Sequence, residues 1–127
     1  MRMPAIIAFM LTPLPGLAGY ASSYEVYPVS PESFEVVTTK GPAAGDYWCG
    51  AGQFTIAQLG RSSTQDIYVV RGRGASSSAP GETSVLFSFQ PPAGGEVESL
   101  SNSVDLIGNA LSAAQAQAYC FDRTIKD

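Results

Sequence analysis

The chain has 127 residues, of which 11 are acidic and 7 are basic, so its net charge is −4. An acidic chain repels phosphates, which disfavours nucleic-acid binding because such binding needs a basic face. The sequence contains no histidine, which excludes Ser-His-Asp and Cys-His nucleophile systems and most zinc sites. The length allows one domain with one hydrophobic core, and neither a metal nor a cofactor is expected.

Residues 1–21 have the layout of a secretory signal peptide: Arg2, an apolar run, two prolines and then small residues. A membrane anchor is the alternative, but a spanning helix needs about 20 apolar residues without paired prolines. We expect cleavage after Ala18 or Ala21, which leaves residues 22–127 as a single domain with no membrane segment. The protein is therefore expected in the periplasm or outside the cell.

Cys49 and Cys120 are the two cysteines of the chain. In an oxidising compartment two cysteines are expected to pair. A bridge between them would close a loop of about 70 residues, which the chain-entropy model credits with roughly 4 kcal/mol of stabilisation. The alternative, a free reactive thiol, lacks the histidine or lysine neighbour that lowers a thiol pKa.

Four segments are typical of β-strands. Residues 24–29 and 34–39 are rich in aromatic and β-branched side chains, and Pro28 suggests that the first lies at a sheet edge. Residues 65–71 are apolar on both faces, as in a central strand. Residues 83–90 alternate, so one face should be buried and the other mostly wet. Residues 72–82 form a long connection, which is typical of a functional or mobile loop.

Two helices are predicted. The first runs from Pro42 to Leu59 and ends at Gly60, with proline in its first turn and glycine past its end. Its inward arc holds Trp48, Cys49, Gly52, Thr55, Ile56 and Leu59. After a short strand at residues 104–107, the second begins at Ser112, whose hydroxyl caps it. Its small inward residues would let the helices approach within disulfide distance; they are Ala113, Ala116 and Cys120.

Tyr47, Ala51 and Phe54 form a second patch on the flank of the first helix. The favoured interpretation is packing against the N-terminal strand or the chain end. The alternative is an exposed aromatic contact surface for a partner.

Arg71 and Arg73 are separated by a glycine, and residues two apart in an extended segment point the same way. Both guanidinium groups could therefore bind one carboxylate or phosphate. The favoured alternative is a strand end with solvated arginines that pair with Glu82 across the hairpin. Carboxylate pairs of a hydrolase are a further possibility, with these candidates: Asp46, Glu82, Glu96, Glu98 and Asp105.

The chain contains four short motifs, at residues 46–52 (D-Y-W-C-G-A-G), 67–68 (I-Y), 71–74 (R-G-R-G) and 118–120 (A-Y-C). In these motifs it resembles an uncharacterised family of small exported bacterial proteins, and the resemblance covers roughly residues 34 to 121. The resemblance implies a bacterial origin. It brings no activity, substrate or binding residue, because none is known for that family.

The elements together predict an α+β fold: a small antiparallel sheet of four to five strands, with two helices on one face joined by the disulfide. For function we expect a non-enzymatic periplasmic or secreted binding domain, whose partner is an envelope protein or a small acidic ligand. The expected contacts are Arg71, Arg73, Tyr47 and Phe54. The alternatives are a small hydrolase that uses acidic residues and an inhibitor of a cell-wall or proteolytic enzyme, which would need a rigid, protruding 72–82 loop.

Overall fold

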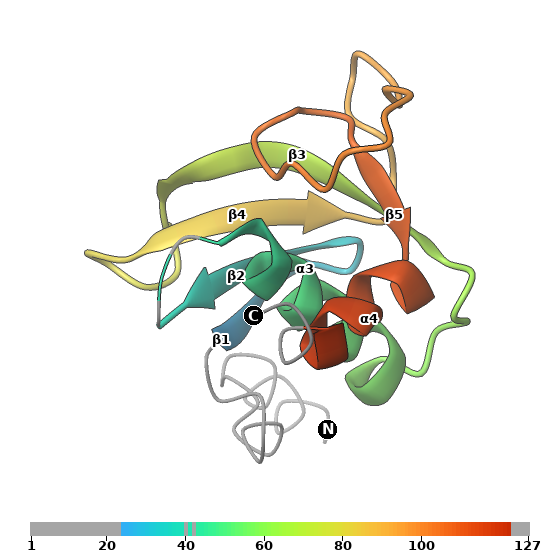
Figure 1. Ribbon diagram of the computed structural model, residues 1–127. Coiled ribbons are helices and arrows are strands. Elements are labelled where there is room, and N and C mark those ends of the chain that lie inside the picture. Colours follow the sequence, from blue (N-terminus) through green and yellow to red (C-terminus); the bar gives the residue numbers. More distant parts are fainter. Residues whose placement is uncertain (1–23, 40, 42, 123–127) are drawn as a thin grey trace, which may run out of the picture.

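The computed structural model describes residues 24–39, 41 and 43–122, so the predicted signal peptide lies outside the described residues. The described chain forms a five-stranded antiparallel sheet in the order β1-β2-β4-β3-β5, with two helices on one face (Figure 1). The predicted α+β fold is confirmed. The strands are β1 (Tyr24–Ser30), β2 (Ser33–Thr38), β3 (Asp66–Ala75), β4 (Thr83–Ser88) and β5 (Ala110–Ser112). The helices are α3 (Ala44–Gln53), its π-helical continuation η2 (Phe54–Gln58) and α4 (Ala113–Asp122).

β1 lies at an edge of the sheet, as its proline predicts. The register between β1 and β2 shifts between Pro28 and Ser30. Proline removes a backbone donor and the irregularity breaks the ladder, so this edge is a poor template for another strand.

The first helix changes geometry before it ends. The amide of Leu59 donates to the carbonyl of Phe54, 3.0 Å away, which is the i to i−5 bond of a π-helix. Gly60 then adopts a φ of +69° and stops the helix. Trp48, Cys49 and Thr55 are buried as predicted, but Leu59 is 45% exposed. Its prediction as an inward residue is wrong because the wider last turn rotates it out of the α-helical arc.

The core fills the space between this helix layer and the sheet. Trp48 packs on Phe87 of β4 with ring centroids 5.0 Å apart, and Phe54 packs on Phe34 of β2 at 4.9 Å. Ile67, Val69 and Val85 from the central strands are fully buried beside them. The hydrophobic core therefore lies on the helix-covered face of the sheet.

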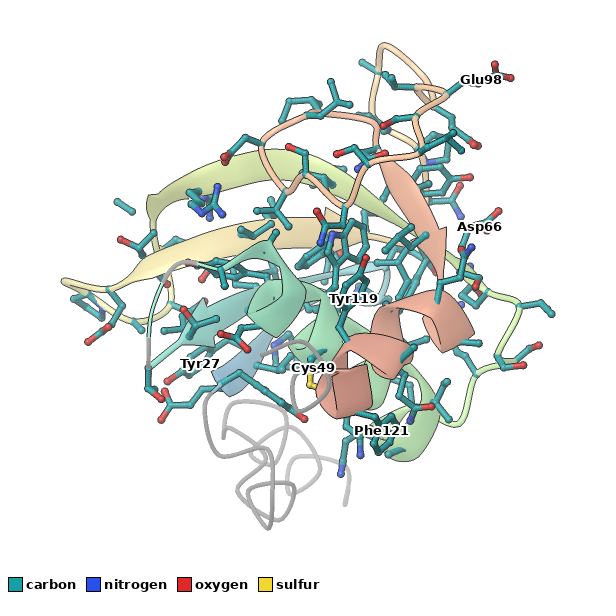
Figure 2. The ribbon with its side chains drawn as sticks, viewed as in Figure 1. Tyr27, Cys49, Asp66, Glu98, Tyr119 and Phe121 are labelled. Carbon is teal, nitrogen blue, oxygen red and sulfur yellow. A yellow bond between two sulfur atoms is a disulfide. The ribbon has the colours of Figure 1, made fainter. Side chains whose placement is uncertain are left out.

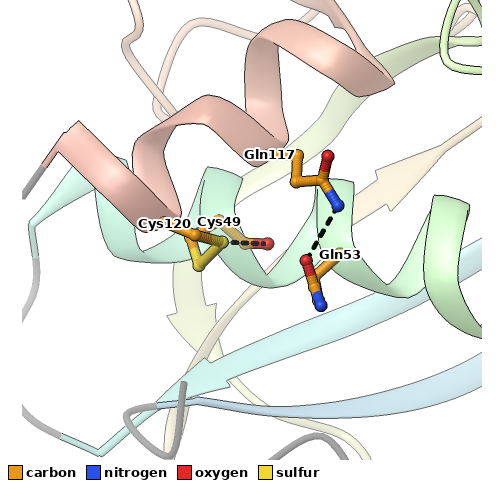
Figure 3. Close-up of a disulfide and its surroundings, with 4 residues drawn as sticks. All are labelled: Cys49, Gln53, Gln117 and Cys120. Atoms are coloured by element: carbon orange, nitrogen blue, oxygen red, sulfur yellow. Dashed lines mark hydrogen bonds between the residues drawn. A yellow bond between two sulfur atoms is a disulfide. The ribbon is translucent and has the colours of Figure 1, made fainter. Parts of the chain in front are cut away.

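The two helices are held together at close range (Figure 3). Cys49 and Cys120 form the predicted disulfide, with their Cα atoms 4.8 Å apart. A Cβ at Gly52 would lie 2.3 Å from the backbone nitrogen of Gln117, so only glycine permits this approach. Beside the contact, Gln117 Nε2 donates to Gln53 Oε1 at 2.9 Å.

The second helix begins as predicted, but the strand before it does not. Ser112 Oγ accepts from the amide of Gln115, whose side chain accepts in return from the amide of Ser112, a reciprocal cap. The last strand is β5, at residues 110–112, and not the predicted 104–107. Residues 104–106 are instead bends that lead into a turn, in which the amide of Asn109 donates to the carbonyl of Leu106.

Candidate functional site

The sheet face opposite the helices, here called the outer face, carries a buried carboxylate. Glu35 lies in the middle of β2, and its side chain is 2% exposed. Its two oxygens accept hydrogen bonds from three consecutive serines of the β3–β4 loop: Ser76 Oγ (2.6 Å), Ser77 N (3.0 Å), Ser77 Oγ (3.1 Å) and Ser78 N (3.2 Å). Arg71 Nη2 adds an ion pair at 3.1 Å. A single side chain thus holds the start of this loop.

These contacts keep Glu35 ionised. Burial, the largest single effect, raises the pKa of a carboxyl group because it desolvates the charged form. The hydrogen bonds from Ser76, Ser77 and Ser78 act in the opposite direction and together outweigh burial, so the pKa falls from 4.5 to about 2. Glu35 is therefore suited to hold a loop and not to act as a general acid near neutral pH.

The β3–β4 loop, residues 76–82, is also closed by its own backbone. The amide of Ser76 donates to the carbonyl of Glu82 at 2.9 Å, and the amide of Glu82 donates to the carbonyl of Ala79 at 3.0 Å. Gly81 has a φ of +87° and follows Pro80, the residue pattern of a type II turn. The tip, from Pro80 to Glu82, is exposed. The loop is longer than a tight hairpin, yet it has a defined shape.

Arg71 and Arg73 lie on opposite faces of the sheet, contrary to the prediction that they point the same way. Arg71 pairs with Leu86 and Gly74 pairs with Ser84, so β3 advances three residues where β4 advances two. Such a bulge reverses the alternation of side chains. The register also shifts once before Arg71, between Val69 and Arg71.

Each arginine consequently has its own carboxylate. Arg71 reaches Glu35 and also donates to Ser84 Oγ at 2.7 Å on the outer face. Arg73 binds Asp105 and lies over the ring of Tyr47, 5.7 Å from its centroid. The hypothesis that both guanidinium groups bind one acidic ligand is therefore wrong, and so is the suggested pairing with Glu82.

The aromatic patch of the first helix is buried. Tyr47 is 1% exposed and Phe54 is 3% exposed. The interpretation as packing is confirmed, and the alternative of an exposed contact surface is wrong. Ser84 and Ser88 of β4 are buried as well, so the outer face of this strand is less exposed to solvent than its alternation predicts. Arg71 lies against Ser84 and donates a hydrogen bond to it.

A second ordered loop follows β4. Residues 97–108, here called the Ω-loop, begin and end together, because the amide of Val97 donates to the carbonyl of Gly108 at 3.0 Å. Trp48 Nε1 donates to the carbonyl of Asn102 at 2.7 Å. Asn109 Nδ2 donates to the carbonyls of Ser101 and Ser103 at 3.0 and 2.9 Å.

Further contacts within the Ω-loop and to the rest of the domain hold it in place. Val104 is fully buried in the core, and Asp105 binds Arg73. Serines at every second position accept from the amide two residues on, at Ser99, Ser101 and Ser103. This serine spacing is a sequence signal for local turns that sequence reasoning missed.

The carboxylates proposed for a hydrolase do not gain support. Asp105 binds Arg73, and Glu96 accepts from Tyr68 Oη at 3.4 Å. In the part of the chain that the structure describes, no group of three His, Cys, Asp or Glu side chains is placed to hold a metal ion. No helix within those same residues is long and apolar enough to cross a membrane.

The two ordered loops, β3–β4 and Ω, are thus the candidate binding elements on the fold. Comparison of the chain with protein-family models, with curated proteins and with solved structures finds no match.

Proposed function

We propose that the protein is a non-enzymatic binding domain, exported to the periplasm or the cell exterior, that recognises a protein partner through the exposed tip of its β3–β4 loop. The proposal includes membership of the small exported bacterial family that the chain resembles. The observation that carries it is the set of hydrogen bonds from Ser76, Ser77 and Ser78 to the buried carboxylate of Glu35.

A loop that is already ordered loses less conformational entropy on binding, so its affinity for a partner is higher. Burying a carboxylate in a sheet is costly unless it is paired, and here the pairing groups all belong to the loop and to Arg71. The fold thus uses a buried charge to fix a segment that contributes little to the core. This arrangement supports recognition by the loop. A small acidic ligand is less well supported, because Arg71 and Arg73 are both ion-paired within the chain.

The test starts from the mature protein with a photo-crosslinking amino acid at Ser78, exposed to native envelope extract. The crosslinked protein is then purified, and its affinity is measured for the unmodified domain, for Glu82→Arg at the loop tip and for Ser63→Arg as the matched control. Ser63 is exposed and lies before β3, away from the tip. The proposal expects Glu82→Arg to weaken binding at least tenfold and Ser63→Arg to leave it unchanged. Equal affinities for the two variants would refute it.

Inhibition of a cell-wall or proteolytic enzyme is the second candidate function, favoured by the same fixed loop. The turn closed by Glu82 N and Ala79 O makes the tip compact. It would therefore cover the mouth of an active-site cleft and would not thread through it as an extended substrate does. The purified partner decides the matter: an enzyme whose turnover falls in proportion to bound domain supports inhibition.

A further inference from the structure

The Ω-loop carries an unusual share of the exposed apolar surface. Leu100 is fully exposed, with a relative accessibility of 107%, and Leu106 and Ile107 are 38% and 44% exposed. Among the described residues the large exposed hydrophobic side chains also include Val29, Leu59 and Phe121. Single exposed apolar residues are ordinary on a protein surface, but three on one short loop are not.

The loop does not expose these residues for lack of order. Its backbone is held by Trp48 and Asn109, and Val104 anchors it in the core. The loop therefore places one apolar side chain inward and leaves three outward. A rigid backbone that presents a leucine to solvent is suited to fill a pocket on another protein, because little entropy remains to be lost.

Charge on the same segment indicates the chemistry of that pocket. Residues 90–112 contain Glu96, Glu98 and Asp105 and no lysine or arginine. Glu96, Glu98 and Leu100 are exposed, while Val97 and Ser99 between them are half-buried, so the two acids and the leucine share the outward side. Figure 2 shows Glu98 pointing away from the sheet at the far end of the molecule.

We propose that the Ω-loop and the adjoining Glu96 form a second interaction surface, on which Leu100 inserts into an apolar pocket of a partner protein. Glu96 and Glu98 meet lysines or arginines at the rim of that pocket. Apolar burial gives the affinity, and the rim charges give orientation and association rate. The negative segment also disfavours an anionic lipid surface as the occupant.

The test places a photo-crosslinking amino acid at position 100 of the mature protein, and at position 59 in a matched control. Leu59 is 45% exposed and lies at the end of η2, so it presents an apolar residue of the same kind elsewhere. The protein crosslinked through position 100 in envelope extract is purified and titrated against the domain at two salt concentrations.

We expect Leu100→Ser to weaken this binding at least tenfold and Leu59→Ser to leave it unchanged. Glu98→Gln should weaken it a few-fold and reduce its dependence on salt. Leu100→Ser should unfold at the same temperature as the unmodified domain, since the side chain makes no core contact.

Four outcomes would overturn the inference: no crosslink from position 100 above that from position 59, a crosslink to a second copy of the domain, sedimentation with phosphatidylcholine vesicles that Leu100→Ser abolishes, or unchanged affinity in Leu100→Ser. Glu82→Arg separates this inference from the proposed function. That variant should leave binding through the Ω-loop intact while it weakens binding through the β3–β4 loop.

Discussion

Arg71 of β3 and Glu35 of β2 form an ion pair across β4, with Nη2 and Oε2 3.1 Å apart, on the face of the sheet opposite the helices. The carboxylate is almost completely buried, whereas about a third of the arginine side chain is exposed. The pair therefore joins the middle of the sheet to the surface. Since three serines complete the coordination of Glu35, replacing this residue should affect the sheet and the loop together.

Glu35→Gln should lower the free energy of unfolding by about 3 kcal/mol, because it leaves the guanidinium and several loop donors without a charged acceptor. Denaturant unfolding followed by the fluorescence of Trp48, the single tryptophan, measures the change. Amide hydrogen exchange at Ser77 and Ser78 should accelerate in the same variant. Glu98 is an exposed glutamate on the Ω-loop, so Glu98→Gln is the control. It should change neither the free energy of unfolding nor the exchange at Ser77 and Ser78.

Acid should break the ion pair and weaken the hydrogen bonds of Glu35. The pKa of Glu35 is lowered from 4.5 to about 2 in the folded protein, so the folded state prefers the ionised form. Its contribution to stability is complete above pH 4.5 and disappears as the pH falls towards 2, with a loss of roughly 3 kcal/mol from this group. Denaturant titrations between pH 6 and pH 2, compared with those of Glu35→Gln, measure the difference. Parallel curves for the two proteins would contradict the prediction.

Gly52→Ala should destabilise the protein more than an ordinary helix substitution and slow formation of the disulfide. Its new Cβ would lie 2.3 Å from the nitrogen of Gln117 and 2.8 Å from the carbonyl oxygen of Ala113, both backbone atoms that cannot move aside alone. Alanine otherwise favours helices by up to about 1 kcal/mol over glycine, so destabilisation identifies the collision. Gly41→Ala is the matched control, since no atom of the described residues lies within 4 Å of the place that a Cβ would take there. Thermal unfolding and thiol titration during refolding are the measurements.

Replacing both cysteines by serine should lower stability by roughly 4 kcal/mol, the chain-entropy value for a loop of this length. The unmodified domain should lose a similar amount in reductant, and the double variant should be insensitive to reductant. A double variant as stable as the oxidised protein would mean that helix packing alone holds α3 and α4 together.

Asn109→Ala should loosen the Ω-loop while leaving the sheet folded. It removes two hydrogen bonds to the carbonyls of Ser101 and Ser103, at a cost of about 2 kcal/mol. Hydrogen exchange should accelerate at residues 99–105 and stay slow in β4. Equal acceleration in both regions would indicate global destabilisation instead.

Periodicity was sufficient to predict most of the architecture. Alternation in β4, the edge proline of β1 and the serine cap of α4 are local features, and a local pattern determines each of them. Cys49 and Cys120 could be paired because the inward stripe of each helix contains one cysteine and small residues. These predictions succeed because each rests on a pattern of residues that are close together in the sequence.

The candidate binding elements could not be predicted in the same way. The faces of Arg71 and Arg73 depend on bulges that arise from pairing with β4, which no alternation rule within β3 contains. The role of Glu35 depends on serines about 40 residues away along the chain. Leu59 lies outside the buried stripe of the first helix because the helix widens to π geometry at its end. The conformation of residues 97–108 depends on hydrogen bonds from Trp48 and Asn109, which lie outside that segment.

The position of the disulfide also bears on the order of events during folding. Cys49 lies in the first helix and Cys120 in the last element that the structure describes, with three strands between them. As the chain emerges, the first thiol must wait for nearly the whole domain before its partner arrives. Closure of the bridge is therefore a late event, because its second cysteine lies in the last helix that the structure describes.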